Sequence, residues 1–307
     1  MKRLRVAFGP EAPAFGSWQW VGADLCQALA AMGHATSVFR DAIPDCDVIV
    51  FVKFKPSASE LRQLRNDGRI LIYFPVDLYD IAASIDLDCD SLRNFHRIIV
   101  HCERLRKYFS VWSKVEYLDH HVKFVAPLPP QRRQDGPFLW IGNRSNLRPV
   151  IDWINQHLLS EELWVLTDFP ADEVISAATA LGFRNGRSVR IERWTPVRHI
   201  EWTTRARAAL DVKGDDFRSR HKPPTKALDF LASGVPLAMN PDSSSTEHLL
   251  QKYGFQIAAL EDQEHWLSAE YWRDVQQLAP RLKSELSLEV VAARFFAMIQ
   301  SLVFGSR

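Results

Sequence analysis

Residues 223–234 combine a lysine and an aspartate at a spacing suited to holding an anion and a sugar hydroxyl. The segment opens with two prolines, which favour a first helical turn, and ends at Gly234, which favours a left-handed helix end. On such a helix Lys226, Asp229 and Ser233 share one face. The lysine and the helix N-terminus would bind a diphosphate, and the carboxylate would accept hydrogen bonds from ribose. The alternative is a solvated pair contributing about 0.2–0.5 kcal/mol.

A cluster of side chains that can carry positive charge comes directly before this helix and strengthens the prediction of an anion site. Its members are Lys213, Arg218, Arg220, His221 and Lys222. Because the two prolines have no N–H group, we expect the side chains of Lys222 and Lys226 and the amides of Thr225 and Lys226 to hold the anion.

Lys226, Asp229, Gly234 and Pro236 together resemble the Lys-x-x-(Glu/Asp)…Gly-x-Pro segment in the second domain of GT-B glycosyltransferases. In this resemblance Asp229 stands at the position that binds ribose, and His221 replaces a glutamate eight residues earlier. The resemblance implies two Rossmann-like parallel-sheet domains that face each other across a cleft. It also implies transfer of a sugar from a nucleotide-diphosphate sugar to an unidentified acceptor, with no cofactor and no obligatory metal.

The alternation of strand and helix patterns predicts an α/β protein with two domains. Residues 1–128 form the predicted first domain, which binds the acceptor in the resemblance, and residues 136–287 form the donor domain. A proline-rich linker separates them, and a last helix within 288–307 is expected to return to the first domain. The fingerprint G-x-G-x-x-G is missing, so nothing indicates a nicotinamide cofactor.

The composition narrows the class of partner. The 307 residues suffice for two domains of about 150 residues each. With 38 basic and 37 acidic side chains the chain is nearly neutral, which argues against nucleic-acid binding. The four cysteines lack metal or redox spacing, and no signal-peptide core or spanning segment is visible. We expect a cytoplasmic protein whose membrane contact is at most peripheral.

Three candidates for proton transfer follow strands of the first domain. Asp77 comes after the strand predicted at 69–74, where ligands collect in open α/β sheets, and His120 and His121 end a later strand. Any of them, or His221, would serve as a base if the reaction inverts the anomeric configuration, whereas retention by front-face attack needs no base. The alternative for Asp77 is a loop-capping turn, and the two histidines lack a third metal ligand.

Other candidates are assigned by position in the resemblance. Arg144 or Arg148, after the first strand of the second domain, would contact diphosphate, because a guanidinium matches paired phosphate oxygens. The further candidates are Gly16 in a loop facing the donor phosphates, Trp194 and Thr195 at the nucleotide base, and Glu247 near the sugar. Helix capping is the alternative for Glu247, and an ordinary turn is the alternative for Gly16.

Other functions share these features. A sugar-nucleotide epimerase has the same fold but needs no acceptor. A transferase relic would bind the nucleotide sugar without reacting, and a two-lobed binding protein would carry an export signal, which is not visible here. The acceptor, the donor base and sugar, and the oligomeric state stay open.

Overall fold

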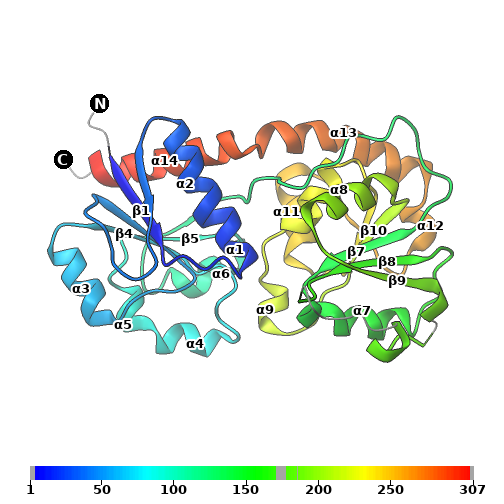
Figure 1. Ribbon diagram of the computed structural model, residues 1–307, viewed down its shortest axis with the longest axis horizontal. Coiled ribbons are helices and arrows are strands. Elements are labelled where there is room, and N and C mark those ends of the chain that lie inside the picture. The colour runs from blue at the N-terminus through cyan, green and yellow to red at the C-terminus, as the bar shows by residue number, and fades with distance from the viewer. Residues whose placement is uncertain (1–3, 171–177, 185, 305–307) are drawn as a thin grey trace. The chain divides into compact units, whose positions relative to one another are not determined.

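The computed structural model describes residues 4–170, 178–184 and 186–304, which form two compact units (Figure 1). Unit 1 comprises Met1–His121, Asp216–Pro223 and Glu285–Arg307, and unit 2 comprises Val122–Asp215 and Pro224–Ser284. The segment 216–223, which the sequence analysis placed in the donor domain, therefore belongs to unit 1. Each unit has its own parallel sheet.

Unit 1 is built on a six-stranded parallel sheet in the order β2-β1-β3-β4-β5-β6. Its strands are β1 (Arg5–Gly9), β2 (Ala35–Val38), β3 (Val48–Val52), β4 (Ile70–Phe74), β5 (Arg97–Val100) and β6 (Val115–Tyr117). Every residue of β3 is buried, as its continuous apolar run predicts for a strand covered on both faces. After β2 the chain returns to the other side of β1, so the strand order reverses between β1 and β3.

Helices cover both faces of the unit 1 sheet (Figure 1). One face packs against α2 (Asp24–Ala31) and α14 (Leu288–Phe304). The other packs against α3 (Ala58–Asn66), α4 (Ala82–Leu87), α5 (Cys89–Leu92) and α6 (Glu103–Phe109). A short α1 (Gly16–Trp18) and a π-helical turn, η1 (Gln19–Ala23), lead into α2, and α9 (Phe217–Arg220) comes from the segment 216–223.

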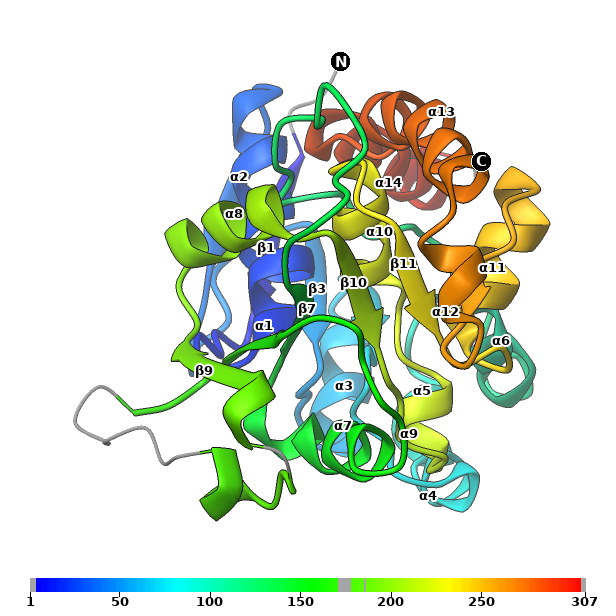
Figure 2. The same ribbon diagram turned by 90° about the vertical axis from the view of Figure 1, so that its right-hand side faces the viewer.

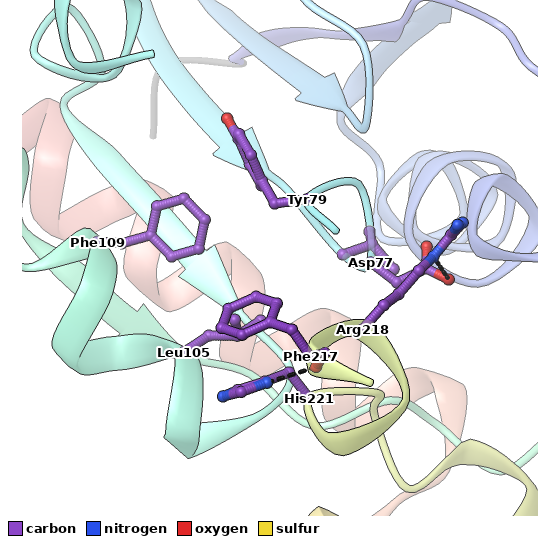
Figure 3. A pocket seen from close by; sticks show the side chains of 8 residues that line it. Asp77, Tyr79, Leu105, Phe109, Phe217, Arg218 and His221 are labelled. Atoms are coloured by element: carbon purple, nitrogen blue, oxygen red, sulfur yellow. Dashed lines mark hydrogen bonds and ion pairs between the residues drawn. The ribbon is translucent and has the colours of Figure 1, made fainter. Parts of the chain in front are cut away.

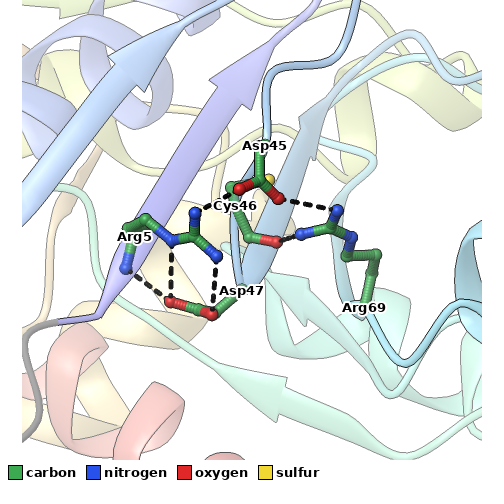
Figure 4. A network of polar contacts seen from close by, with 5 residues as sticks. All are labelled: Arg5, Asp45, Cys46, Asp47 and Arg69. Atoms are coloured by element: carbon green, nitrogen blue, oxygen red, sulfur yellow. Dashed lines mark hydrogen bonds and ion pairs between the residues drawn. The ribbon is translucent and has the colours of Figure 1, made fainter.

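A network of arginines and aspartates lies where β1, β3 and β4 begin (Figure 4). Asp47 accepts the backbone N–H of Arg5 at 2.9 Å, and the Arg5 guanidinium also pairs with Asp45. Arg69 donates to Asp45 at 2.8 Å and to the carbonyl of Cys46. The hydrogen bonds from Arg69 and Arg5 lower the pKa of Asp45. This edge of the sheet is therefore occupied by contacts within the protein, and the opposite edge is where ligands collect in such sheets.

Unit 2 contains the second six-stranded parallel sheet, in the order β12-β11-β10-β7-β8-β9. Its strands are β7 (Phe138–Gly142), β8 (Leu163–Thr167), β9 (Val189–Arg193), β10 (Ala208–Asp211), β11 (Leu237–Met239) and β12 (Ala258–Ala259). Figure 2 shows β7, β10 and β11 side by side. The strand order reverses between β7 and β10. Together the two sheets confirm the predicted pair of Rossmann-like domains.

The helices of unit 2 follow its strands along the chain. They are α7 (Leu147–Ile154), α8 (Pro196–Arg205), α10 (Thr225–Ala232), α11 (Ser244–Tyr253), α12 (Gln263–Trp266) and α13 (Ala269–Glu285), with 3-10 turns η2 (Arg144–Asn146), η3 (Ala178–Leu181) and η4 (Gly186–Ser188). In the described ranges, no single helix is long and apolar enough to cross a membrane; the bent pair α13 and α14 reaches that length and composition only when the two are taken together.

Helix α10 ends as the sequence predicts. Its last residue is Ala232, and Gly234 takes a left-handed φ of 70°. A Cβ at Gly234 would lie 2.7 Å from Nε2 of Gln276, whose flexible side chain can move, so the left-handed backbone is what favours glycine there. This turn directs the chain into β11 after two further residues.

We expect Phe295→Ala to destabilise unit 1 by about 3–5 kcal/mol, because the variant leaves a cavity in a packed core. Phe295 is fully buried in α14, with ring centroids 6.1 Å from Phe8 and 5.4 Å from Phe74. Phe304→Ala on the same helix is the matched control, since Phe304 is 45% exposed. Urea unfolding measures both variants, and equal losses of stability would contradict the assignment of Phe295 to the core.

Candidate functional site

A buried carboxylate between two lysines lies at the strand-order reversal of unit 2. Asp211 is the last residue of β10 and is only 1% exposed. Nζ of Lys213 lies 2.8 Å from its Oδ2, and Nζ of Lys226 lies 3.0 Å from its Oδ1. Burial alone would raise the pKa of Asp211, but the two lysines outweigh burial and lower this pKa to about 2. The carboxylate is therefore ionised at neutral pH, and the three groups carry one net positive charge.

The Lys226 side chain is held by several groups from different strands. Its ammonium donates to the carbonyl of Ile141 at 2.8 Å and lies 5.1 Å from the ring of Trp140. These residues belong to β7, so Lys226 connects the start of α10 to the ends of β7 and β10. The Lys226 side chain remains 28% exposed, and the positive charge is thus fixed in position while still reaching the surface.

Gly142 allows this close approach. A Cβ at Gly142 would lie 2.6 Å from the ring of Trp140 and 3.2 Å from Nζ of Lys226. Any side chain at this position would therefore displace the ring or the ammonium. The end of β7 is bare backbone beside a cation, as expected where a protein binds an anionic group closely.

Asp229 and Ser233 share the face of α10 that the sequence predicts, but that face is covered. Asp229 is 2% exposed, and its carboxylate accepts the backbone N–H of Lys123 at 2.8 Å and that of Phe124. Ser233 accepts the N–H of Ala126 at 2.9 Å. In this structure Asp229 fixes the segment 122–126 onto the helix, and its role in binding ribose stays a prediction.

Trp194 and Thr195 follow β9, where the sequence analysis places them. Nε1 of Trp194 donates to Nδ1 of His199 at 3.2 Å, and Phe124 packs against both rings. Thr195 is the N-cap of α8 and accepts the N–H of Arg198 at 3.1 Å. Trp194 therefore belongs to an aromatic cluster, and the Thr195 hydroxyl has a structural role.

The remaining candidates of unit 2 lie at the surface or in helix starts. Arg148 pairs with Asp152 at 2.8 Å and has an 80% exposed side chain. The Arg144 guanidinium lies 5.0 Å from the ring of Phe169. Glu247 sits in the first turn of α11 and accepts from Gln251 at 3.2 Å, and Thr225 is the first residue of α10.

Asp77 and His221 line the same small cavity in unit 1 (Figure 3). The cavity has a volume of about 10 Å³, room for about one water molecule. His221 contacts the rings of Phe217 and Tyr108, and its Nδ1 lies 2.6 Å from the carbonyl oxygen of Phe217. The structure therefore brings together two residues that the sequence analysis selected separately, but the cavity itself is too small for a sugar.

Asp77 is held by cations. Its Oδ1 accepts from Nζ of Lys53 at 3.0 Å, and its Oδ2 lies 3.7 Å from Nε of Arg218. Burial would raise the pKa of Asp77, but Lys53, with Arg218 and Lys222, outweighs burial and lowers it. Asp77 is thus a weaker proton acceptor than an ordinary aspartate.

His120 and His121 lie in the interior of unit 1, being 4% and 3% exposed. Nε2 of His121 lies 3.0 Å from Asp24, and the His120 ring lies 4.1 Å from that of His101. Burial, followed by the charges of neighbouring histidines, holds the pKa of His120 well below its usual value. Gly16 begins α1, and a Cβ there would meet only the ring of Trp20 at 3.8 Å, so space does not require glycine.

Sequence reasoning missed Asp211 and Lys53. Each had a local signal, because each is a charged residue at the end of an apolar strand: Asp211 follows three apolar residues, and Lys53 directly follows the buried β3. A charge in such a position needs a partner when it is buried. Among the described residues, no group of three or more His, Cys, Asp or Glu side chains is arranged to hold a metal ion.

Comparison with known proteins identifies the fold. No protein-family model and no curated protein sequence matches this chain. Among solved structures it resembles AviGT4, a glycosyltransferase involved in avilamycin A biosynthesis, with 14% identity, 98% of each chain covered and a TM-score of 0.61. It also resembles WaaG, a glycosyltransferase involved in lipopolysaccharide biosynthesis, with 12% identity, 98% of this chain and 100% of that chain covered and a TM-score of 0.54.

A third similar structure is a putative UDP-N-acetylglucosamine 2-epimerase from Listeria monocytogenes, with 10% identity, 98% of this chain and 97% of that chain covered and a TM-score of 0.50. At these identities the likeness establishes a fold. The chain has the GT-B fold predicted from its sequence.

We expect the stability of the protein to depend on pH through Asp229. Burial raises the pKa of this carboxyl to about 7, against the opposing effect of the two amides. Because the folded-state pKa lies above the unfolded value, the stability from this group is fully present below about pH 4 and is lost as pH rises through 7. Between pH 4 and pH 8, the wild type should therefore lose about 4 kcal/mol more stability than Asp229→Asn.

Urea unfolding at both pH values tests this expectation. Asp229→Ala is the control, because it removes every acceptor and should be about 1–3 kcal/mol less stable than Asp229→Asn at either pH by leaving amides unpaired. The same pH dependence in the wild type and in Asp229→Asn would show that this carboxyl is not the titrating group.

Proposed function

We propose that this chain, which has the GT-B fold, transfers a sugar from a nucleotide-diphosphate sugar to an acceptor. The observation that supports this most strongly is the pair of lysines held by buried Asp211 at the strand-order reversal of unit 2. Ligands of doubly wound sheets bind outside the carboxyl ends of the strands at such a reversal. A fixed cation there suits the diphosphate of the donor.

Sugar transfer benefits from a fixed positive charge, because negative charge develops on the leaving diphosphate. When the bond between the anomeric carbon and the diphosphate oxygen breaks, its electron pair stays on the diphosphate. Asp211 and Ile141 hold the Lys226 ammonium in place before any ligand arrives, so little reorganisation is needed as negative charge develops. The backbone at Gly142 and the start of α10 complete an edge that accepts an anion.

The surroundings of the predicted bases indicate whether the transfer retains or inverts the anomeric configuration. Asp77 has a lowered pKa, His120 and His121 are buried, and His221 lines a cavity too small for a sugar. These environments disfavour an enzymic base that removes the proton of the acceptor hydroxyl. They favour front-face transfer with retention, in which the departing diphosphate takes that proton while the hydroxyl oxygen bonds to the anomeric carbon.

A thermal-shift panel of UDP-, GDP-, ADP- and CMP-sugars tests donor binding. We expect one diphosphate donor to raise the melting temperature, and CMP-sugars, which lack a diphosphate, to have no effect. Lys226→Ala should weaken binding of that donor by about 10–100-fold, because a charged hydrogen bond to phosphate is lost. Arg205→Ala is the control, since that guanidinium is exposed, is paired with Glu201 and belongs to no predicted binding site. Indifference to every donor, or full affinity in Lys226→Ala, would count against the proposal.

Incubation with the donor alone separates transfer from epimerisation. An epimerase changes one sugar centre without an acceptor, whereas a transferase leaves the sugar unchanged or hydrolyses it slowly. We expect chromatography to show no epimer of the donor sugar after prolonged incubation. Formation of an epimer, lost in Lys226→Ala, would assign the epimerase function, and binding with neither reaction under any acceptor would indicate a non-catalytic relic.

A further inference from the structure

We propose that the strand-order reversal of unit 1 carries an acceptor subsite for the pyranose ring of a neutral saccharide, formed by Phe15, Phe54 and Asp77. This inference rests on the proposed transferase function, and it specifies the class of acceptor that the function leaves open. The three side chains follow the carboxyl ends of β1, β3 and β4.

The proposed subsite lies where the strand order of the unit 1 sheet reverses. Strand β1 pairs with β2 on one side and with β3 on the other, so the order reverses between β1 and β3. Phe15 lies on the loop that leaves β1, and Lys53 and Phe54 directly follow β3. This edge of unit 1 therefore has the topology at which doubly wound sheets bind ligands.

Two exposed aromatic side chains meet at this edge of the sheet. Among the residues that the structure describes, three aromatic side chains are exposed: Phe15 at 40%, Phe54 at 38% and Phe304 at 45%. The rings of Phe15 and Phe54 contact each other edge to face, with centroids 5.4 Å apart. Two of the three exposed aromatic rings thus meet at the predicted ligand edge.

A buried ion pair lies beside this aromatic pair. Lys53 is 5% exposed, and its ammonium lies 4.4 Å from the centre of the Phe15 ring and 3.0 Å from Oδ1 of Asp77. The ammonium holds the Phe15 ring by a cation–π contact and neutralises much of the charge of Asp77. Apolar rings and one oriented polar pair therefore adjoin, a combination typical of sites for small organic ligands.

Backbone strain accompanies this arrangement. Lys53 has a φ of 64° and Val76 a φ of 52°, both in the left-handed region that residues with a Cβ avoid. Such residues cost about 1–3 kcal/mol each and concentrate at functional sites. Strands β3 and β4 are neighbours, paired up to Val52 and Phe74, so both strained residues flank the same spot. The strain turns the chain just before Phe54 and Asp77.

The chemistry of these groups selects the ligand. A pyranose has a C–H face that packs on an aromatic ring and hydroxyl groups that donate to a carboxylate. A plain alkyl chain would leave the Lys53–Asp77 pair unused. Asp77 would accept a hydrogen bond from a hydroxyl and orient the ring, and its lowered pKa keeps it ionised for this role.

Saturation-transfer NMR with methyl glycosides of glucose, galactose, mannose and N-acetylglucosamine tests the subsite. We expect at least one glycoside to bind, with affinity at least fivefold weaker in Phe15→Ala, Phe54→Ala and Asp77→Asn. Phe304→Ala is the matched control, being an equally exposed phenylalanine of unit 1, and should bind as the wild type does. Circular dichroism and melting temperature confirm that each variant folds.

Two results would overturn the inference: no methyl glycoside binds, or a glycoside binds equally well to Phe15→Ala and Phe54→Ala. Binding of farnesyl phosphate alone, dependent on Phe15, would also overturn it by assigning a lipid ligand. The donor panel is measured on the same variants, and its result does not depend on whether a glycoside binds. Glycoside binding that depends on Phe15, with no donor bound, would retain the saccharide subsite and reject the transferase function.

Discussion

The interaction on which unit 2 depends is the ion pairing of Asp211 with Lys213 and Lys226. A carboxylate that is 1% exposed is costly to desolvate, and removing either partner would leave charge insufficiently compensated in the interior. The same contacts connect the end of β10, the loop that follows it and the first turn of α10. The ion pairing of Asp211 therefore both fixes the local structure at the ends of β7 and β10 and places the positive charge there.

Unit 1 also has a buried charged residue at a strand end, but its surroundings differ from those of Asp211. Lys53 is buried next to Asp77 at the ends of β3 and β4, and two residues there adopt a left-handed backbone. The reversal in unit 2 presents a net positive charge and bare backbone at Gly142, whereas that in unit 1 presents a largely neutralised pair and exposed rings. These differences match the two substrates of the proposed reaction, a charged donor and a neutral saccharide.

Several residues that were selected for chemistry are buried in packed surroundings. Asp229 was expected at an open ribose site, and instead it receives the backbone of the segment 122–126. His120 and His121 were selected because they follow a strand, and they lie inside unit 1 next to His101 and Asp24. Spacing on a helix predicts which residues share a face, but it cannot say which segment covers that face.

The amino-acid pattern alone was sufficient for the two parallel sheets and for α10 with its end at Gly234, because period, proline and glycine act locally. The GT-B fold was predicted from the resemblance to a known family. The pattern also identified Lys226 as a cation at a helix start. Only the tertiary structure revealed that Asp211 and Lys213 surround it, and that Phe15, Phe54 and Asp77 gather at one edge. Those contacts join residues far apart in the chain, and strand order, which a single sequence does not contain, decides which strand ends become neighbours.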